Sequence, residues 1–143
     1  MSMMTYGVQS KCMVLKYKDL AELLFKNKQK IQEKEYFDFT NINSVDDIDF
    51  SDICDFAYYI NYACYFGDIT GYLILQDDES KTINYENEDI IIIELEKDDL
   101  FHCYKDYTEI YDELIKDFQD VGIDIDINYI KEHFGTLNAS YYA

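Results

Sequence analysis

The sequence contains no proline, no tryptophan and no arginine, whereas isoleucine, asparagine, lysine, tyrosine and aspartate are abundant. This bias is typical of an AT-rich genome, so the many tyrosines and isoleucines are partly a coding effect. AT-rich codons favour lysine as well, yet the chain has 30 acidic and only 12 cationic residues, which gives a net charge of −18. The shortage of cations therefore needs a reason beyond codon usage.

Long apolar runs and targeting signals are also missing. A membrane-spanning helix needs about 18 predominantly apolar residues, and the four isoleucines at 90–93 fall far short of that length. The first residues lack the continuous apolar centre and the small-residue cleavage site of a signal peptide. We therefore expect a cytoplasmic protein with no membrane contact. Its thiols are expected to be reduced and mostly buried: Cys12, Cys54, Cys64 and Cys103.

The motifs of common enzymes and metal sites are absent as well. The chain has no GxSxG, no P-loop and no GxGxxG, and its only histidines, His102 and His133, lie in neither an HExxH nor a CxxC context. The stretch from Asp124 begins like a calcium loop, but Tyr129 replaces the sharp-turn glycine and Gly135 replaces the bidentate glutamate. We therefore predict a protein that is not an enzyme, with no catalytic residue, no cofactor and no metal.

The charge is distributed unevenly along the chain. Residues 1–35 hold seven lysines and four acids, a net charge of +3, whereas residues 36–143 hold five lysines and 26 acids, a net charge of −21. A field of this sign repels nucleic acid and anionic membranes and attracts basic proteins. We therefore expect no direct binding to nucleic acid, because phosphate contacts need clustered cations.

The chain shows no repeat and no glycine-rich linker, so we predict a single α+β domain over residues 1–143, with a loosely attached N-terminus at 1–12. Alternating and apolar runs separated by turn residues predict a three-stranded antiparallel β-meander. The four isoleucines are apolar on both faces, so their strand is expected to be central or covered by helices. The expected strands lie at about 71–76, 81–86 and 89–96. About four helices are expected to flank them, at about 18–33, 51–66, 107–121 and 127–134.

Two of these helices carry the residues that matter for function. In the helix at 107–121, apolar residues follow the i, i+3, i+4, i+7 pattern, acids occupy the outer face, and Asp106 with Glu109 resembles a capping box. In the helix at 51–66, Asp55 and several tyrosines lie opposite the apolar face. These tyrosines either pack beneath a second layer or meet a partner, for which an aromatic ring with a polar tip is well suited.

The leading hypothesis is an inhibitor that presents carboxylates where a nucleic-acid-binding enzyme expects phosphates. Acids three or four residues apart repeat about every 5 Å along a helix face, which is the same order as the charge spacing along a nucleic-acid strand. Exposed tyrosines would add the anchor area that charge alone does not supply. The candidate partner-binding residues are Asp46, Asp49, Asp52, Asp55, Tyr58, Tyr62, Glu109, Asp112, Glu113, Asp117 and Asp120.

The expected partner is a basic protein such as a nuclease, as for phage or mobile-element inhibitors of CRISPR or restriction enzymes. One alternative is an immunity protein or antitoxin that neutralises a toxin, because the electrostatics would be similar. Another is a homo-oligomeric structural or regulatory module, for example a homodimer, in which the tyrosines at 58, 62 and 65 meet their symmetry mates.

Overall fold

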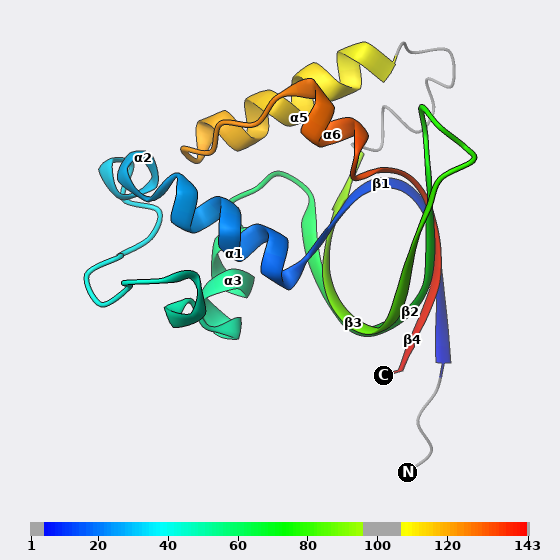
Figure 1. The fold of residues 1–143 in the computed structure, drawn as a ribbon, viewed down its shortest axis with the longest axis horizontal. Helices are drawn as coiled ribbons and strands as arrows, with labels where there is room; N and C mark the ends of the chain where they lie inside the picture. The colour runs from blue at the N-terminus through cyan, green and yellow to red at the C-terminus, as the bar shows by residue number, and fades with distance from the viewer. Residues whose placement is uncertain (1–4, 96–106, 143) are drawn as a thin grey trace.

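The fold is built around a closed barrel of four antiparallel strands (Figure 1). The structure is a computed structural model that describes residues 5–95 and 107–142. The strands are paired in the order β1–β3–β2–β4, and β4 pairs with β1 to close the ring. Their bounds are Thr5–Lys16 for β1, Ala63–Leu75 for β2, Thr82–Glu94 for β3 and Phe134–Tyr142 for β4.

The four consecutive isoleucines of β3 show how both sides of the barrel wall are used. They pair with residues 13–16 of β1 and with residues 63–66 of β2. Side chains alternate between the two faces of a strand, so Ile90 and Ile92 pack inside the barrel, whereas Ile91 and Ile93 pack against the helices. All four are fully buried. The strand was predicted to be central or covered by helices, and the helices do cover its face at Ile91 and Ile93.

The predicted three-stranded meander is wrong, because the sheet is a closed four-stranded barrel. Of the segments expected as separate strands at 81–86 and 89–96, residues 82–86 and 89–94 belong to the single strand β3, and residue 96 lies outside the described residues. Between them, Asn87 has a left-handed backbone (φ 50°), and its N–H donates to the hydroxyl oxygen of Thr70 on β2 (3.1 Å). The polar residues that suggested a turn therefore form an irregularity within one continuous strand.

The sequence pattern does not predict β1 or β4. Residues 5–12, expected to be loosely attached, form most of β1 and pair with β4. Gly135, expected to end a helix at 127–134, lies inside β4. A Cβ at this position would overlap the carbonyl oxygen of Ile74 on β2. The absence of a side chain therefore lets β2 and β4 approach closely enough to complete the ring.

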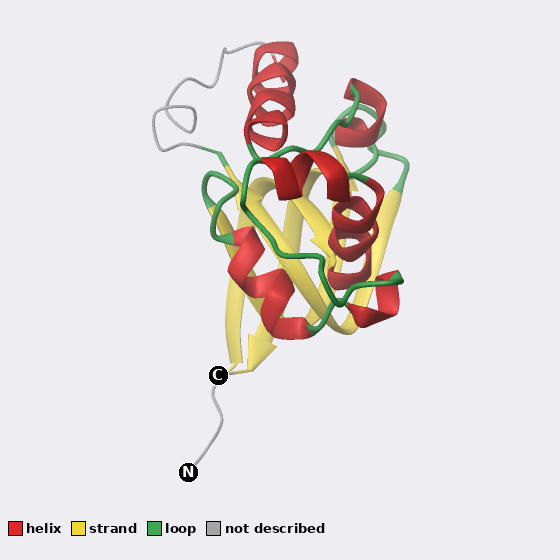
Figure 2. Ribbon diagram, turned by 90° about the vertical axis from the view of Figure 1, so that its left-hand side faces the viewer, coloured by secondary structure: helices red, strands yellow, loops and turns green. Residues whose placement is uncertain are grey.

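The helices gather over one side of the barrel (Figures 1 and 2). Their buried side chains form one core cluster with the outward-facing residues of β1 and β3, such as Leu15 and Ile91. No helix in the described part of the chain has both the length and the apolar character needed to cross a membrane. The bounds are Tyr17–Lys26 for α1, Lys28–Glu33 for α2, Phe50–Ala57 for α3, Tyr107–Asp120 for α5, Ile127–Lys131 for α6, and Val45–Asp47 for the 3-10 helix η1.

The helices expected from the sequence differ from the observed ones mainly at their ends. The one expected at 107–121 corresponds to α5, and its expected cap, Asp106, lies outside the described residues. The one expected at 18–33 is divided between α1 and α2 at Asn27, whose side-chain amide donates to the carbonyl of Leu23 (2.9 Å). The one expected at 127–134 is shorter, and Asp126 caps it by accepting the N–H of Tyr129 (2.9 Å).

The largest difference concerns the helix expected at 51–66, which ends at Ala57. Residues 63–66 belong to β2 and pair with the four isoleucines of β3. Cross-strand pairing with these four fully buried isoleucines therefore outweighs the helical periodicity of this segment. The residues between α3 and β2 consequently form a turn.

Candidate functional site

The turn between α3 and β2 presents tyrosine rings to solvent, and we call residues 58–62 the tyrosine turn. Tyr58 is 86% exposed, Tyr59 53% and Tyr62 50%, whereas Ile60 between them is buried. The N–H of Tyr59 donates to the carbonyl of Phe56 (2.9 Å), which continues the end of α3 for one more turn. The buried isoleucine and the backbone hydrogen bonds therefore hold the turn in place while its tyrosines point outward.

Tyr62 has an unusual backbone conformation. Its φ is 58°, in the left-handed region that bulky residues rarely adopt. Such a conformation costs about 1–3 kcal/mol and persists only where the surroundings enforce it. The carbonyl of Tyr62 accepts a hydrogen bond from the N–H of Glu94 at the end of β3 (3.1 Å). The tyrosine turn is thus tied to the barrel at its C-terminal end.

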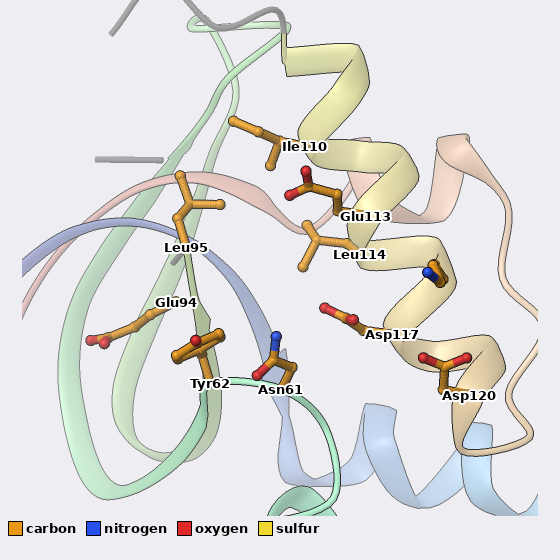
Figure 3. A pocket seen from close by; sticks show the side chains of 10 residues that line it. Asn61, Tyr62, Glu94, Leu95, Ile110, Glu113, Leu114, Asp117 and Asp120 are labelled. Carbon is orange, nitrogen blue, oxygen red and sulfur yellow. The ribbon is translucent and has the colours of Figure 1, made fainter. Parts of the chain in front are cut away.

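Tyr62 lines a cavity of about 240 Å³ between the tyrosine turn and α5, which we call the α5 cavity (Figure 3). Three carboxylates of α5, from Glu113, Asp117 and Asp120, line it together with Asn61 and Lys116. Figure 3 shows Glu113 and Asp117 pointing from α5 toward the side of the cavity where Asn61 and Tyr62 lie. The buried side chains of Leu95, Ile110 and Leu114 supply its apolar lining.

A second cavity, of about 420 Å³, lies between α3 and the loop after α2, and we call it the α3 cavity. Asp52 and Asp55 of α3 line it, as does Tyr59 of the tyrosine turn. The loop contributes Tyr36 and Phe37, as well as Asp38, Asn41 and Ile42. The ring centroids of Tyr36 and Tyr59 are 5.0 Å apart at an interplanar angle of 58°. The tyrosine turn therefore contributes side chains to two cavities that both contain carboxylates and aromatic rings.

The structure places seven of the eleven residues predicted from the sequence to bind a partner in the two cavities or on the tyrosine turn. Four are in the α5 cavity (Tyr62, Glu113, Asp117 and Asp120), two are in the α3 cavity (Asp52 and Asp55), and Tyr58 lies on the turn that serves both. The other four, Asp46, Asp49, Glu109 and Asp112, are exposed but line neither cavity.

The predicted row from Asp46 to Asp55 is not one helical face, because α3 begins only at Phe50. Asp49 is its N-cap, and the carboxylate of Asp49 accepts the N–H of Asp52 (2.9 Å). This hydrogen bond lowers the pKa of Asp49. Partial burial raises the pKa of Asp52, and the negative charges of Asp49 and Asp55 add to that effect. Asp49 is therefore the N-cap of α3, although its side chain is exposed.

Sequence reasoning missed the contribution of the loop after α2 to the α3 cavity. Tyr36, Phe37 and Asp38 repeat the combination of acid and aromatic that marks the segment from Asp52 to Tyr62. This similarity of composition is the one feature of the sequence that could have indicated a shared site. The loop has no periodic pattern, however, so nothing in the sequence places it against α3.

Four ion pairs among the described residues lie outside the two cavities. Lys16 pairs with Glu88 (3.2 Å) and Lys131 with Asp77 (3.8 Å), while two further pairs join Lys30 to Asp124 and Lys81 to Asp78. No lysine, arginine or histidine occurs between residues 35 and 80. Carboxylates therefore dominate the charge at the α3 cavity and the tyrosine turn.

Histidine and cysteine side chains are the residues most often found in catalytic and metal-binding sites. In the described ranges, no group of three or more histidine, cysteine, aspartate or glutamate side chains is arranged to hold a metal ion. The Nδ1 atom of His133 lies 2.8 Å from the carbonyl oxygen of Tyr129, and its ring stacks on that of Tyr129. His102 and Cys103 lie outside the described residues. Burial raises the pKa of the Cys12 thiol to about 12, so it is not a nucleophile at neutral pH.

No protein-family model, no curated protein and no solved structure matches this chain. The tyrosine turn and its two cavities, with their geometry and negative charge, are therefore the candidate functional site.

Proposed function

We propose that this protein is a small acidic inhibitor that binds a basic nucleic-acid-binding enzyme and presents carboxylates in place of phosphates. The observation that supports it is the exposure of Tyr58, Tyr59 and Tyr62 on a turn flanked by two carboxylate-lined cavities. Exposed aromatic side chains that gather in one place mark interaction surfaces. Their acidic surroundings favour a cationic partner.

The carboxylates of α5 have a suitable spacing for this role. Glu113, Asp117 and Asp120 lie four and three residues apart on one helix, so they repeat about every 5 Å along it. One DNA strand carries a charge about every 3.4 Å along its axis, which is a spacing of the same order. With a net charge of −18, the protein would also be steered quickly toward a basic surface.

The tyrosines would supply the specificity that scattered charge lacks. Binding energy at protein interfaces is concentrated in a few residues, and tyrosine is one of the enriched types. Tyr58 would be the central anchor, because it is the most exposed of the three and lies on the turn that contributes residues to both cavities. A nuclease of a CRISPR or restriction system, met in the host-cell cytoplasm by a phage or mobile-element product, is the partner class that we propose.

The test compares two charge reversals on the same helix. One variant carries Glu113→Lys and Asp117→Lys inside the α5 cavity, and its matched control carries Glu109→Lys and Asp112→Lys outside it. Each pair changes the net charge from −18 by +4, to −14. We expect the first pair to weaken binding to the nuclease more than tenfold and the control pair by much less, measured by calorimetry against a panel of purified CRISPR and restriction nucleases.

Circular dichroism of both variants checks that the helix remains folded. Equal losses for the two pairs would show that the partner senses only total charge. If no nuclease in the panel binds the unmodified protein, the proposed function is refuted.

A further inference from the structure

We infer that the α3 cavity binds an arginine side chain presented by the protein partner. That the arginine belongs to a protein partner rests on the proposed function. That the α3 cavity favours an arginine side chain rests on separate observations. Most of these concern residues of the loop after α2, in particular Tyr36 and Phe37, together with Tyr59 of the tyrosine turn.

Aromatic rings form one wall of the α3 cavity. Tyr36 and Tyr59 meet with their centroids 5.0 Å apart and their planes tilted by 58°, so the two rings form a corner. Phe37 adds a third ring to the lining. The faces of aromatic rings carry negative electrostatic potential and attract organic cations, among which guanidinium is the commonest in proteins. This wall therefore favours a flat cation over an anion.

Carboxylates complete the cavity and are held in place by local hydrogen bonds. Asp38 accepts the N–H of Thr40 through Oδ1 (3.0 Å), and Asp52 accepts the N–H of Asp49 through Oδ2 (3.2 Å). Asp55, on the next turn of α3, is exposed. Carboxylates fixed in this way suit the fork of N–H donors that a guanidinium group carries.

The residues that line the α3 cavity favour an arginine side chain over a lysine side chain. The planar guanidinium group stacks on aromatic rings and is weakly hydrated, whereas the lysine ammonium group is a compact and strongly hydrated charge. Ile42 and Phe56 supply apolar surface for the methylene groups of an inserted side chain. No described residue that lines this cavity is cationic, whereas Lys116 lines the α5 cavity. The α3 cavity is thus the better receptor for an added cation.

The test is a titration of the whole protein with N-acetyl-arginine methylamide, followed by amide chemical shifts. Parallel titrations use the lysine analogue, tetramethylammonium chloride and sodium chloride at equal ionic strength. We expect saturable shifts confined to residues 36–42 and 52–59 with the arginine compound. The lysine analogue should bind at least about threefold more weakly.

Variants connect the binding to the cavity. Tyr59→Leu removes a ring face and Asp55→Asn removes a charge, and each should weaken arginine binding about three- to fivefold. Tyr59→Phe keeps the ring and should bind as the unmodified protein does. The matched controls are Tyr72→Leu and Glu86→Gln, which change exposed barrel residues outside the cavity and should have no effect.

Several outcomes would overturn the inference. They are equal binding of arginine and lysine, tighter binding of tetramethylammonium, shifts spread over the whole acidic surface, or unchanged affinity in both Tyr59→Leu and Asp55→Asn. The titration contains no nuclease, so it separates this inference from the proposed function. Arginine binding without any nuclease partner would refute only the proposed function, whereas nuclease binding that is unaffected by Tyr59→Leu would refute only the arginine site.

Discussion

Tyr85 lies inside the barrel with 3% of its surface exposed, whereas Tyr58 on the tyrosine turn is 86% exposed. The two residues are chemically identical and both come from a tyrosine-rich sequence. In the barrel, paired strands direct side chains inward, and burial raises the pKa of Tyr85 above its ordinary value. On the tyrosine turn, Ile60 alone is buried and its neighbours are left outside. The backbone, rather than the composition, therefore decides which tyrosines stabilise the fold and which are available to a partner.

The largest effect on stability is expected from a substitution that creates a cavity inside the barrel, where the side chains stabilise the fold. Ile92 is fully buried and packs in the cluster that fills the barrel interior. Ile92→Ala is expected to lower the free energy of unfolding by about 2–5 kcal/mol, because transfer and cavity effects add. Urea denaturation measures the change. A loss below about 1 kcal/mol would contradict the account of a tightly packed interior.

The closure of the barrel can be tested at Gly135. Gly135→Ala is expected to lower the free energy of unfolding by about 1–3 kcal/mol, since the added methyl group would overlap the backbone of β2 at Ile74. The matched control is Gly7→Ala in β1, where an added Cβ meets nothing within 4 Å. If thermal denaturation shows the same effect for both variants, β2 and β4 are not in close contact at this position.

Alkaline pH should weaken the barrel through Cys12. Burial raises the pKa of this thiol from 9.0 to about 12. An unfolded chain therefore loses the proton at lower pH than the folded protein does, so this stabilising effect is complete below pH 9.0 and declines as the pH rises toward 12. We expect Cys12→Ala to reduce the slope of stability against pH in that interval. Parallel curves for the two proteins would contradict the prediction.

The smallest effect on stability is expected at Tyr58. Because its ring is exposed, Tyr58→Ala should change the free energy of unfolding by no more than about 0.5 kcal/mol. The same substitution should weaken binding to the partner nuclease at least tenfold if this ring is the anchor. Denaturation and calorimetry on one sample give both numbers. A destabilisation comparable to that of Ile92→Ala would mean that Tyr58 belongs to the core.

The sequence predicted those elements whose pattern is local. Helix α5 has an uninterrupted apolar stripe, and its expected bounds differ from the observed ones by one residue. The isoleucines at 90–93 indicated a strand buried on both faces, because nothing polar interrupts them. In both cases the residue pattern that determines the helix or strand is contained within a short continuous segment.

The elements that sequence reasoning missed depend on distant partners. In β1, Val14 faces the barrel interior and Leu15 faces the helices, so the strand shows no alternation. Gly135 resembled a helix stop, and only its contact with β2 shows why a glycine is needed. The sequence left open whether Tyr58 and Tyr62 are covered by a second layer or face a partner, and it placed both in a helix that in fact ends before either residue. Tyr36 and Asp38 line the α3 cavity from a loop whose position no local sequence pattern predicts.

The central claim is that the tyrosine turn and its flanking carboxylates bind a basic enzyme in place of nucleic acid. The most direct measurement is the dissociation constant of the protein–nuclease complex as a function of salt concentration, with and without a DNA competitor. We predict that binding weakens steeply with salt, that DNA competes for the same surface, and that Tyr58→Ala weakens binding at every salt concentration. Binding that is indifferent to salt and to DNA, or unchanged in Tyr58→Ala, would contradict the account.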